Sequence, residues 1–382
     1  MPLIRRIGIE GFRRLKYVDI EMRPVMALIG ANSVGKTSFM DALSLLAASA
    51  RGSLNQYLND LGGISSVITK DRSGEIVLSG EMDNPGHEPP KYSLRLVPQG
   101  QGYAISEESL TQVTPGRPDL FKHIDSRYGD IQFYDPHTRR LQRPDWGYDS
   151  LESALSQVPR MYRQSEQLRR TLGSATQYHV LDVSQRAPVK LPQQLRPAML
   201  PGQNGEELAP FLYNLRETNR MKFEAVEDSL RAAFPGFESL GFPVAATGMI
   251  SITWKDKAFQ YPFYTHELSE GTLRFLWLVS LLQSPDLSTI TMIDEPEVSL
   301  HPELLSLLAD LMREASLRTQ IVVATHSDRL VRFLHPSEVV VMDTTEDGAA
   351  TMTWGDTFDL DEWLTEYSLD GVWQMGVMGG RA

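Results

Sequence analysis

The sequence contains no cysteine among its 382 residues. Disulfide bonds and thiolate zinc sites are therefore excluded, and the composition is compatible with a reducing compartment. Long apolar segments are lacking too. The most apolar run, residues 275–282, is far shorter than the ~20 residues that a membrane-spanning helix needs. The opening MPLIRRIGIEGF has no apolar stretch typical of a signal peptide. These absences predict a cytoplasmic protein with no membrane partner.

Positive charge is scarce, since 37 Lys and Arg residues stand against 49 Asp and Glu residues and leave a net charge of −12. Proteins that bind nucleic acid over their whole surface are usually basic. Nucleic acid is therefore disfavoured as a general partner, although a local basic patch stays open. The chain also has no long heptad run, which excludes a coiled-coil arm.

Apolar patterns predict an α/β fold in three parts. Residues 1–100 contain strand patterns, among them the continuously apolar VMALI of residues 25–29, which is typical of a buried strand. Residues 101–245 contain two long segments with helical spacing and predict an inserted, mainly helical subdomain. Residues 246–382 return to alternating strands and helices. We expect the first and last parts to form two lobes of one domain.

A glycine-rich segment, GANSVGKTS, follows the buried strand and precedes a helical pattern. It fits G-x-x-x-x-G-K-[ST], in which the glycines let successive backbone N–H groups surround phosphate. Lys36 is expected to reach the β- and γ-phosphates, and the Thr37 hydroxyl to ligate Mg²⁺. The helix that begins near Lys36 adds its positive end. The predicted nucleotide-binding residues are Gly30, Ala31, Asn32, Ser33, Val34, Gly35, Lys36, Thr37 and Ser38.

Two adjacent acids end the apolar run TITMI of residues 289–293. At the end of a strand their side chains diverge, so one can hold Mg²⁺ while the other faces a water in line with the γ-phosphate. We assign Asp294 to the metal and Glu295 to general base catalysis or water positioning. A solvated acidic turn is the alternative.

A histidine follows the next apolar run, QIVVAT of residues 320–325. His326 is therefore expected beside the strand that carries the acids, where it can touch the γ-phosphate and hold the attacking water. A histidine that merely ends a strand, with its hydrogen bonds satisfied, is the alternative. The order of the motifs along the chain favours the catalytic interpretation.

The segment LSEGT, residues 268–272, resembles the ABC signature sequence LSGGQ and runs straight into an amphipathic helix. Ser269, Glu270 and Gly271 would then form a second anion-binding helix N-terminus. One chain would have two phosphate-binding ends for one nucleotide. A head-to-tail homodimer resolves this, because each signature can cap the nucleotide of the other subunit. A capped core helix without a ligand is the alternative.

Taken in order, GANSVGKTS, LSEGT, DEPEVSLHP and ATHS make the chain similar to the ABC-type ATPases of the SMC/RecF/OLD group, and most of all to the OLD-like AAA-type branch. The resemblance implies a P-loop NTPase fold, ATP and Mg²⁺ as cofactors, and ATP hydrolysis. It also implies that Ser299, Leu300 and His301 contact the opposing subunit and couple the two sites. It places Arg13, Arg14 or Tyr17 near the nucleotide, while Gln56 is the nearest but unassigned counterpart of a Q-loop glutamine.

Departures from the family pattern shape the expected function. Glu270 and Thr272 replace the Gly and Gln of the fuller signature. Only 56 residues follow His326, too few for the TOPRIM nuclease domain of OLD proteins. We therefore expect an ATP-dependent dimeric switch that regulates a separate effector such as a nuclease, in phage defence. The alternatives are a RecF-like DNA-repair ATPase, the nucleotide-binding subunit of an ABC transporter, and a module that holds ATP without turnover.

Overall fold

A computed structural model describes residues 4–70, 73–84, 87–114, 116, 119–360, 363–364 and 367–379. The chain divides into two compact units. The first unit contains residues 1–176, 337–359 and 376–382, and the second contains residues 177–336 and 360–375.

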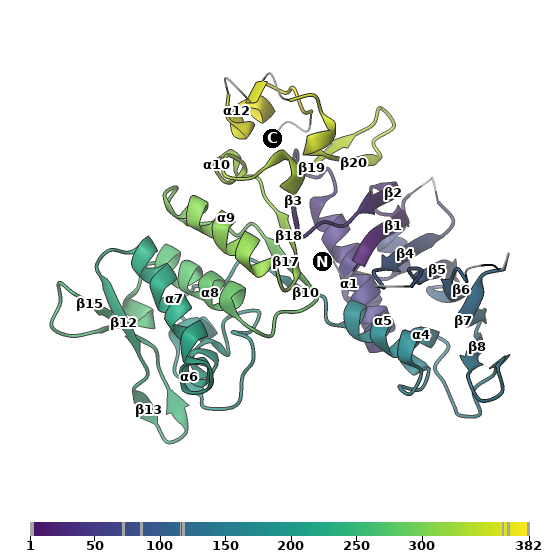
Figure 1. Ribbon diagram of the computed structural model, residues 1–382, viewed down its shortest axis with the longest axis horizontal. Coiled ribbons are helices and arrows are strands. Elements are labelled where there is room, and N and C mark those ends of the chain that lie inside the picture. The colour runs from purple at the N-terminus through teal and green to yellow at the C-terminus, as the bar shows by residue number, and fades with distance from the viewer. Residues whose placement is uncertain are drawn as a thin grey trace. The chain divides into compact units, whose positions relative to one another are not determined.

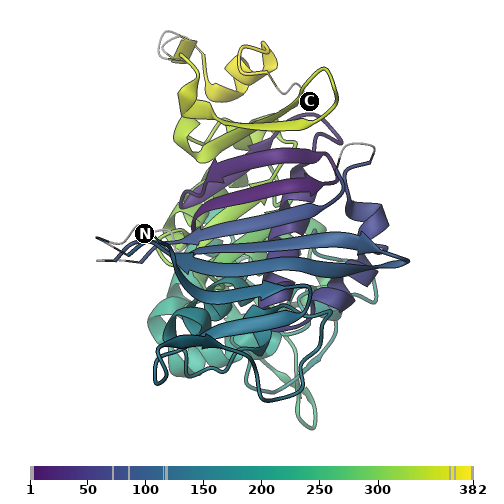
Figure 2. The same ribbon diagram turned by 90° about the vertical axis from the view of Figure 1, so that its right-hand side faces the viewer.

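The first unit is built on an eight-stranded antiparallel sheet, whose purple and blue strands lie side by side in Figure 2. Buried and less buried residues alternate along these strands, as in Ile76–Met82, because successive side chains of a strand point to opposite faces. One face is therefore apolar and packs on helices, while the other is polar. In sheet order the strands are β2 (Leu15–Glu21), β1 (Ile4–Phe12), β4 (Ile76–Met82), β5 (Lys91–Gln99), β6 (Gly102–Gln112), β7 (Phe121–Arg127), β8 (Asp130–Asp135) and β9 (Arg140–Gln142).

Helix α1 (Lys36–Arg51) is almost completely buried. It packs against α2, α4 and α5 on one side of the sheet (Figure 1). Strand β3 (Val25–Ile29), which leads into α1, lies parallel to β19 (Val339–Thr344), and β19 pairs antiparallel with β20 (Ala350–Trp354). The remaining helices are α2 (Leu54–Asp60), α3 (Ile64–Val67), α4 (Ala154–Gln157) and α5 (Arg163–Gly173).

The expectation of a mainly helical insertion that starts at residue 101 is wrong for residues 102–142, which form strands β6 to β9. The physical reason is the period of their apolar pattern. Burial in β7 and β8 follows alternate residues, which suits one face of a sheet and not one side of a helix. Among the described residues from 101 to 245, the first helix is α4, which begins at Ala154. The domain boundaries themselves stay a prediction.

The second unit holds two parallel strands, β17 (Ile290–Asp294) and β18 (Gln320–Ala324), in a register that pairs Asp294 with Ala324. Their carboxyl ends therefore lie together. Both strands are mostly apolar, and all their residues are buried except Asp294 at the end of β17. Four helices pack on one another in this unit (Figure 1): α6 (Leu208–Thr218) on α7 (Arg220–Ala233), α7 on α8 (Glu270–Gln283), and α8 on α9 (Leu304–Ala315).

Short elements complete the fold. Two three-stranded antiparallel sheets have the orders β11-β14-β13 and β12-β15-β16. No helix in the described part of the chain combines the length and the apolar character that crossing a lipid bilayer requires. The short elements are β10 (Thr176–Tyr178), β11 (Gln193–Gln194), β12 (Phe237–Gly241), β13 (Val244–Ala246), β14 (Met249–Ile250), β15 (Thr253–Asp256), β16 (Phe263–Tyr264), α10 (Asp328–Val331), α12 (Leu369–Gln374) and the 3₁₀ turns η1 (Pro188–Lys190), η2 (Thr265–Glu267), η3 (Pro336–Glu338) and η4 (Gly355–Thr357).

Candidate functional site

The glycine-rich segment connects the buried strand β3 to helix α1, the arrangement that its sequence predicts. Its backbone bends sharply, with φ angles of 148° at Gly30, 65° at Ser33 and 125° at Gly35. A Cβ at Gly30 would lie 2.3 Å from the carbonyl oxygen of Met342, a distance that real Cβ atoms do not reach. The loop therefore requires glycine at this position, as a backbone that wraps closely around an anion does.

Lys36 is the first residue of α1 and is 5% exposed. Its Nζ donates hydrogen bonds to the carbonyl oxygens of Gly30 at 2.5 Å and Ala31 at 3.0 Å. The ammonium group is thus held over the loop by the loop's own carbonyls. Thr37, the next residue, is exposed, and Ser38 is buried. The first N–H groups of a helix have no acceptor within it, so the start of α1 and the Lys36 charge together favour an anion.

The two acids lie at the end of β17 in the second unit. Asp294 Oδ2 is 4.0 Å from Nδ1 of His179. Glu295 has a φ of 46°, an uncommon conformation for a residue other than glycine, and such conformations gather at functional sites. Its backbone N–H donates to Ala324 O at 2.8 Å, which anchors it to the end of β18.

His326 lies just beyond β18, and its Nε2 is 3.9 Å from Oε1 of Glu295. The structure therefore brings together the acid and the histidine that the sequence analysis assigned to catalysis. The parallel pairing of β17 and β18 is the cause, because both residues follow strands whose carboxyl ends lie side by side.

Glu297 joins the same two strand ends. Its Oε1 accepts hydrogen bonds from the Thr325 hydroxyl at 2.5 Å and from the backbone N–H of His326 at 3.3 Å. Burial raises the pKa of this carboxyl, while these two hydrogen bonds act in the opposite direction. The sequence analysis missed Glu297, although it lies within the quoted DEPEVSLHP.

The signature segment forms the N-terminus of α8. Ser269 is the N-cap, and its Oγ accepts a hydrogen bond from the N–H of Thr272 at 3.2 Å. Ser269 and Glu270 are exposed. Ser269 thus caps the helix, as the alternative of a capped helix without a ligand predicts. It also remains accessible to solvent at the helix tip.

The segment predicted to contact the opposing subunit lies against this helix. A Cβ at Gly271 would be 2.5 Å from the carbonyl oxygen of Ser299. Arg274 Nη1 donates to Ser299 Oγ at 2.6 Å. Ser299 has a φ of 63° and is exposed, as is His301, whose Nδ1 is 3.7 Å from Glu303 Oε2. Leu300, which is half-buried, donates its backbone N–H to Glu297 O at 3.0 Å.

Arg13, Arg14 and Tyr17, placed near the nucleotide by resemblance alone, and the unassigned Gln56 all belong to the first unit. Arg13 has a φ of 50° and makes an ion pair with Asp41 of α1. Arg14 is exposed, and so is Gln56 on α2. Tyr17 is 69% exposed. Their roles stay predictions.

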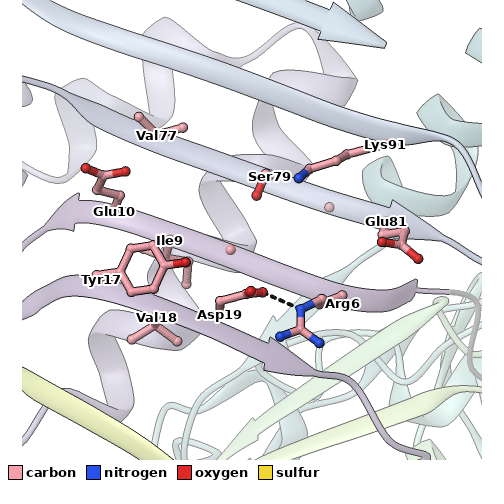
Figure 3. Close-up of a pocket in the computed structure, with 12 residues that line it drawn as sticks. Arg6, Ile9, Glu10, Tyr17, Val18, Asp19, Val77, Ser79, Glu81 and Lys91 are labelled. Carbon is pink, nitrogen blue, oxygen red and sulfur yellow. Dashed lines mark hydrogen bonds and ion pairs between the residues drawn. The ribbon is translucent and has the colours of Figure 1, made fainter. Parts of the chain in front are cut away.

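An open hollow of about 410 Å³ lies on the polar face of the eight-stranded sheet (Figure 3). Tyr17 lines the hollow from β2, Ser79 from β4 and Lys91 from β5. Arg6 and Asp19 also line the hollow, and Arg6 Nε donates a hydrogen bond to Asp19 Oδ1 at 2.6 Å. No residue of the glycine-rich loop lines this hollow, so it is separate from the predicted phosphate site.

Two further residues of the second unit were missed by the sequence analysis. His179, whose Nδ1 is 4.0 Å from Asp294 Oδ2, directly follows β10. Arg274 lies within the helical pattern that follows the signature, on α8, and its guanidinium contacts Ser299. Neither residue belongs to a recognisable motif. Only the residues that each one contacts in the folded structure indicate a role.

Comparison with known families gives one match that spans most of the chain. Residues 25–332 match the family described as "AAA domain, putative AbiEii toxin, Type IV TA system". The chain belongs to this family. A comparison with curated proteins found no match.

The chain is also similar to crystal structures of Smc head domains. The Smc head bound to the C-winged helix domain of ScpA has a TM-score of 0.57 at 17% identity, over 92% of this chain and 98% of that chain. The Smc head with an extended coiled coil bound to the C-terminal domain of ScpA, derived from Pyrococcus furiosus, has a TM-score of 0.55 at 14% identity, over 96% and 100%. The head with a coiled coil and joint from Pyrococcus yayanosii has a TM-score of 0.51 at 10% identity, over 95% and 100%. At these identities the matches show the fold alone, and they confirm the predicted α/β P-loop fold.

Proposed function

We propose that this member of the AAA family binds ATP with Mg²⁺ in the loop of residues 30–38 and hydrolyses it. The glycine geometry of the loop and the Lys36 ammonium at the start of α1 support phosphate binding. The observation that carries hydrolysis is the 3.9 Å approach of His326 Nε2 to Glu295 Oε1. Two groups that can orient and deprotonate one water molecule lie together at adjacent strand ends.

Each residue then has a defined task. The loop N–H groups and Lys36 hold the β- and γ-phosphates. Glu295 accepts a proton from the attacking water, and His326 orients that water towards the γ-phosphate. Magnesium, when bound, would neutralise charge on the phosphate oxygens.

The assignment of Thr37 and Asp294 to magnesium rests on their motifs, a hydroxyl that follows the phosphate-loop lysine and a carboxylate that ends an apolar strand. Among the described residues no group of three or more His, Asp and Glu side chains can hold a metal ion. Mg²⁺ usually takes one or two protein oxygens and completes its shell with phosphate and water, so the proposed site needs no larger cluster.

We further propose that two copies assemble head to tail around two ATP molecules. Ser269, Glu270 and Gly271 would cap the nucleotide of the opposite subunit, and residues 299–301 would contact that subunit. The exposed Ser269 at the tip of a 14-residue helix supports this assignment, because such a tip favours anions.

The dimer would act in the cytoplasm as a switch for a separate effector such as a nuclease, in phage defence. The family description, which names a toxin of a toxin–antitoxin system, supports a regulatory setting. The Smc heads crystallised with ScpA domains show that this fold can hold a second protein. A RecF-like role on DNA is the alternative function, and salt-sensitive DNA affinity would support it.

Phosphate release by the purified chain tests the proposal. Wild-type protein with ATP and Mg²⁺ should release phosphate, and the rate per chain should rise with protein concentration because the site needs two copies. The His326→Ala variant should lose most of this rate, about 100-fold or more, since acid–base groups typically contribute that much. A wild-type rate equal to that of Lys36→Ala would overturn the proposal.

A further inference from the structure

The Glu297 side chain accepts hydrogen bonds from the loop of residues 325–327, which carries His326. The Thr325 hydroxyl donates to Glu297 Oε1 and accepts a hydrogen bond from the N–H of Ser327 at 3.0 Å. The N–H of His326 donates to the same carboxyl oxygen. Three consecutive residues are thus held, directly or through Thr325, by one carboxylate.

The loop is also held at its far end. Ser327 is the N-cap of α10, and its side chain accepts a hydrogen bond from the N–H of Leu330 at 3.3 Å. At its near end the loop continues from β18, where Ala324 O accepts the N–H of Glu295. The backbone of His326 is therefore fixed by hydrogen bonds on both sides. Its side chain is directed at Glu295.

The other carboxyl oxygen of Glu297 gives a second, independent observation. Glu297 Oε2 is buried and has no hydrogen-bond partner among the described residues. A buried polar atom without a partner lowers stability. Natural proteins accept such local costs mainly at functional sites. An apolar residue at this position would avoid the cost but would release Thr325 and His326.

The geometry points to Glu297 as a positioning residue that holds the His326 ring against Glu295. This inference rests on the proposed ATP hydrolysis. Glu297 itself does not touch the reacting atoms. It fixes the backbone of His326, and with it the distance between the two groups that orient the water. A displacement of about 1 Å in such a pair can lower a rate by about 100-fold.

The competing explanation is that Glu297 only stabilises the ends of β17 and β18. The two explanations differ in what happens when His326 is absent. A positioning residue has nothing left to position, whereas a structural residue still stabilises the fold.

Substitutions at Glu297 and Thr325 form matched pairs. Glu297→Ala removes the acceptor, while Glu297→Gln keeps an oxygen that can accept both hydrogen bonds. Thr325→Val removes the donor with little change in volume, while Thr325→Ser keeps it. We expect kcat to fall about 10- to 100-fold in Glu297→Ala and Thr325→Val, with the KM for ATP unchanged. The Gln and Ser variants should stay within about threefold of wild type.

A double-mutant cycle decides between positioning and stability. In the His326→Ala background, Glu297→Ala should lower kcat by less than about twofold further, because the two residues act as one unit. A multiplicative loss in the double variant would overturn the inference. So would a wild-type kcat in both Glu297→Ala and Thr325→Val.

A measurement without nucleotide separates this inference from the proposed function. The eight histidines give imidazole signals in NMR spectra of labelled protein, and His326→Ala identifies the signal of His326. That signal should move in Glu297→Ala and remain in place in Glu297→Gln. An unmoved signal in Glu297→Ala contradicts the inference. A wild-type protein that does not hydrolyse ATP contradicts the proposed function, while the NMR result still stands.

Discussion

Gly271 and Ser299 approach so closely that no side chain fits between them. A Cβ on Gly271 would lie 2.5 Å from the carbonyl oxygen of Ser299. On the next turn of the same helix, Arg274 donates a hydrogen bond to Ser299 Oγ. The tip of α8 and the segment after the acidic pair are thus one packed structure within the second unit. Movement of one is expected to move the other.

We expect Gly271→Ala to destabilise the protein by ~1–3 kcal/mol, the usual cost of forcing an extra group into a packed site. The obstacle is a backbone atom, which cannot rotate away. The unfolding midpoint in urea measures this change. Gly147→Ala is the matched control, because a Cβ there meets nothing within 4 Å, and such surface changes usually stay within ~0.5 kcal/mol. Equal midpoints for the two variants would contradict the tight approach of Gly271 to Ser299.

Lys36→Ala should lower the affinity for ATP by about 100-fold or more, because the phosphates lose a charge-assisted hydrogen bond and a counter-charge. Isothermal titration with ATP and Mg²⁺ measures the affinity. Lys16→Ala is the control. Lys16 is exposed and only makes a surface ion pair with Asp347 at 3.5 Å, which contributes little. Unchanged affinity in Lys36→Ala would refute the assignment of the phosphate loop.

Glu295→Gln should trap an ATP-bound dimer, because the nucleotide stays intact without a group that takes the proton from water. Light scattering with ATP and Mg²⁺ should then report twice the 43.0 kDa of one chain. Without magnesium the same variant should remain monomeric. If only monomer is seen under both conditions, the site composed of two subunits is wrong.

A buried carboxyl on β6 makes stability depend on pH. Glu108 is completely buried. It accepts hydrogen bonds from the N–H groups of Ala154 at 2.6 Å and Leu155 at 2.8 Å and from the Tyr92 hydroxyl at 2.9 Å. Burial raises its pKa from 4.5 to about 7, although the three hydrogen bonds act to lower it. Burial thus outweighs hydrogen bonding here.

The raised pKa of Glu108 determines whether folding stability rises or falls with pH. Between pH 4.5 and about 7 the folded protein keeps the Glu108 proton and the unfolded chain has lost it. Stability therefore falls as pH rises through this window, by about 3 kcal/mol in total at 1.36 kcal/mol per unit. Glu108→Gln cannot ionise and should lose this slope. Denaturant unfolding at several pH values measures it, and parallel curves for the two proteins would argue against the shift.

Much of the fold and part of the site were predictable from contiguous residues. Residues 25–38 predict a buried strand, a glycine-rich turn and a helix, and the structure has β3, the loop and α1 in that order. Such segments are predictable because a glycine pattern and an apolar run constrain the backbone locally, whatever the rest of the chain does. The apolar runs before Asp294 and His326 are predictable as strands for the same reason, whereas their parallel pairing depends on the folded structure.

Strand pairing in the middle of the chain was not predictable in this way. Residues 102–142 carry polar residues on one face of the sheet, and their short alternating segments were attributed to a helical insertion. Whether such a segment becomes a strand depends on a neighbouring edge to pair with, here that of β5. Each strand from β6 to β9 pairs with the strand directly before it, so all four depend on β5 to supply the first edge.

The order and spacing of four motifs, taken alone, already implied the family, the ligand class and the residues proposed to act on phosphate. Tertiary folding alone placed Glu297 under the His326 backbone, His179 beside Asp294, and Arg274 against Ser299. The physical reason is that a motif records the conformation of neighbouring residues, whereas a contact between residues 25 or more positions apart exists only after distant strands and helices have packed.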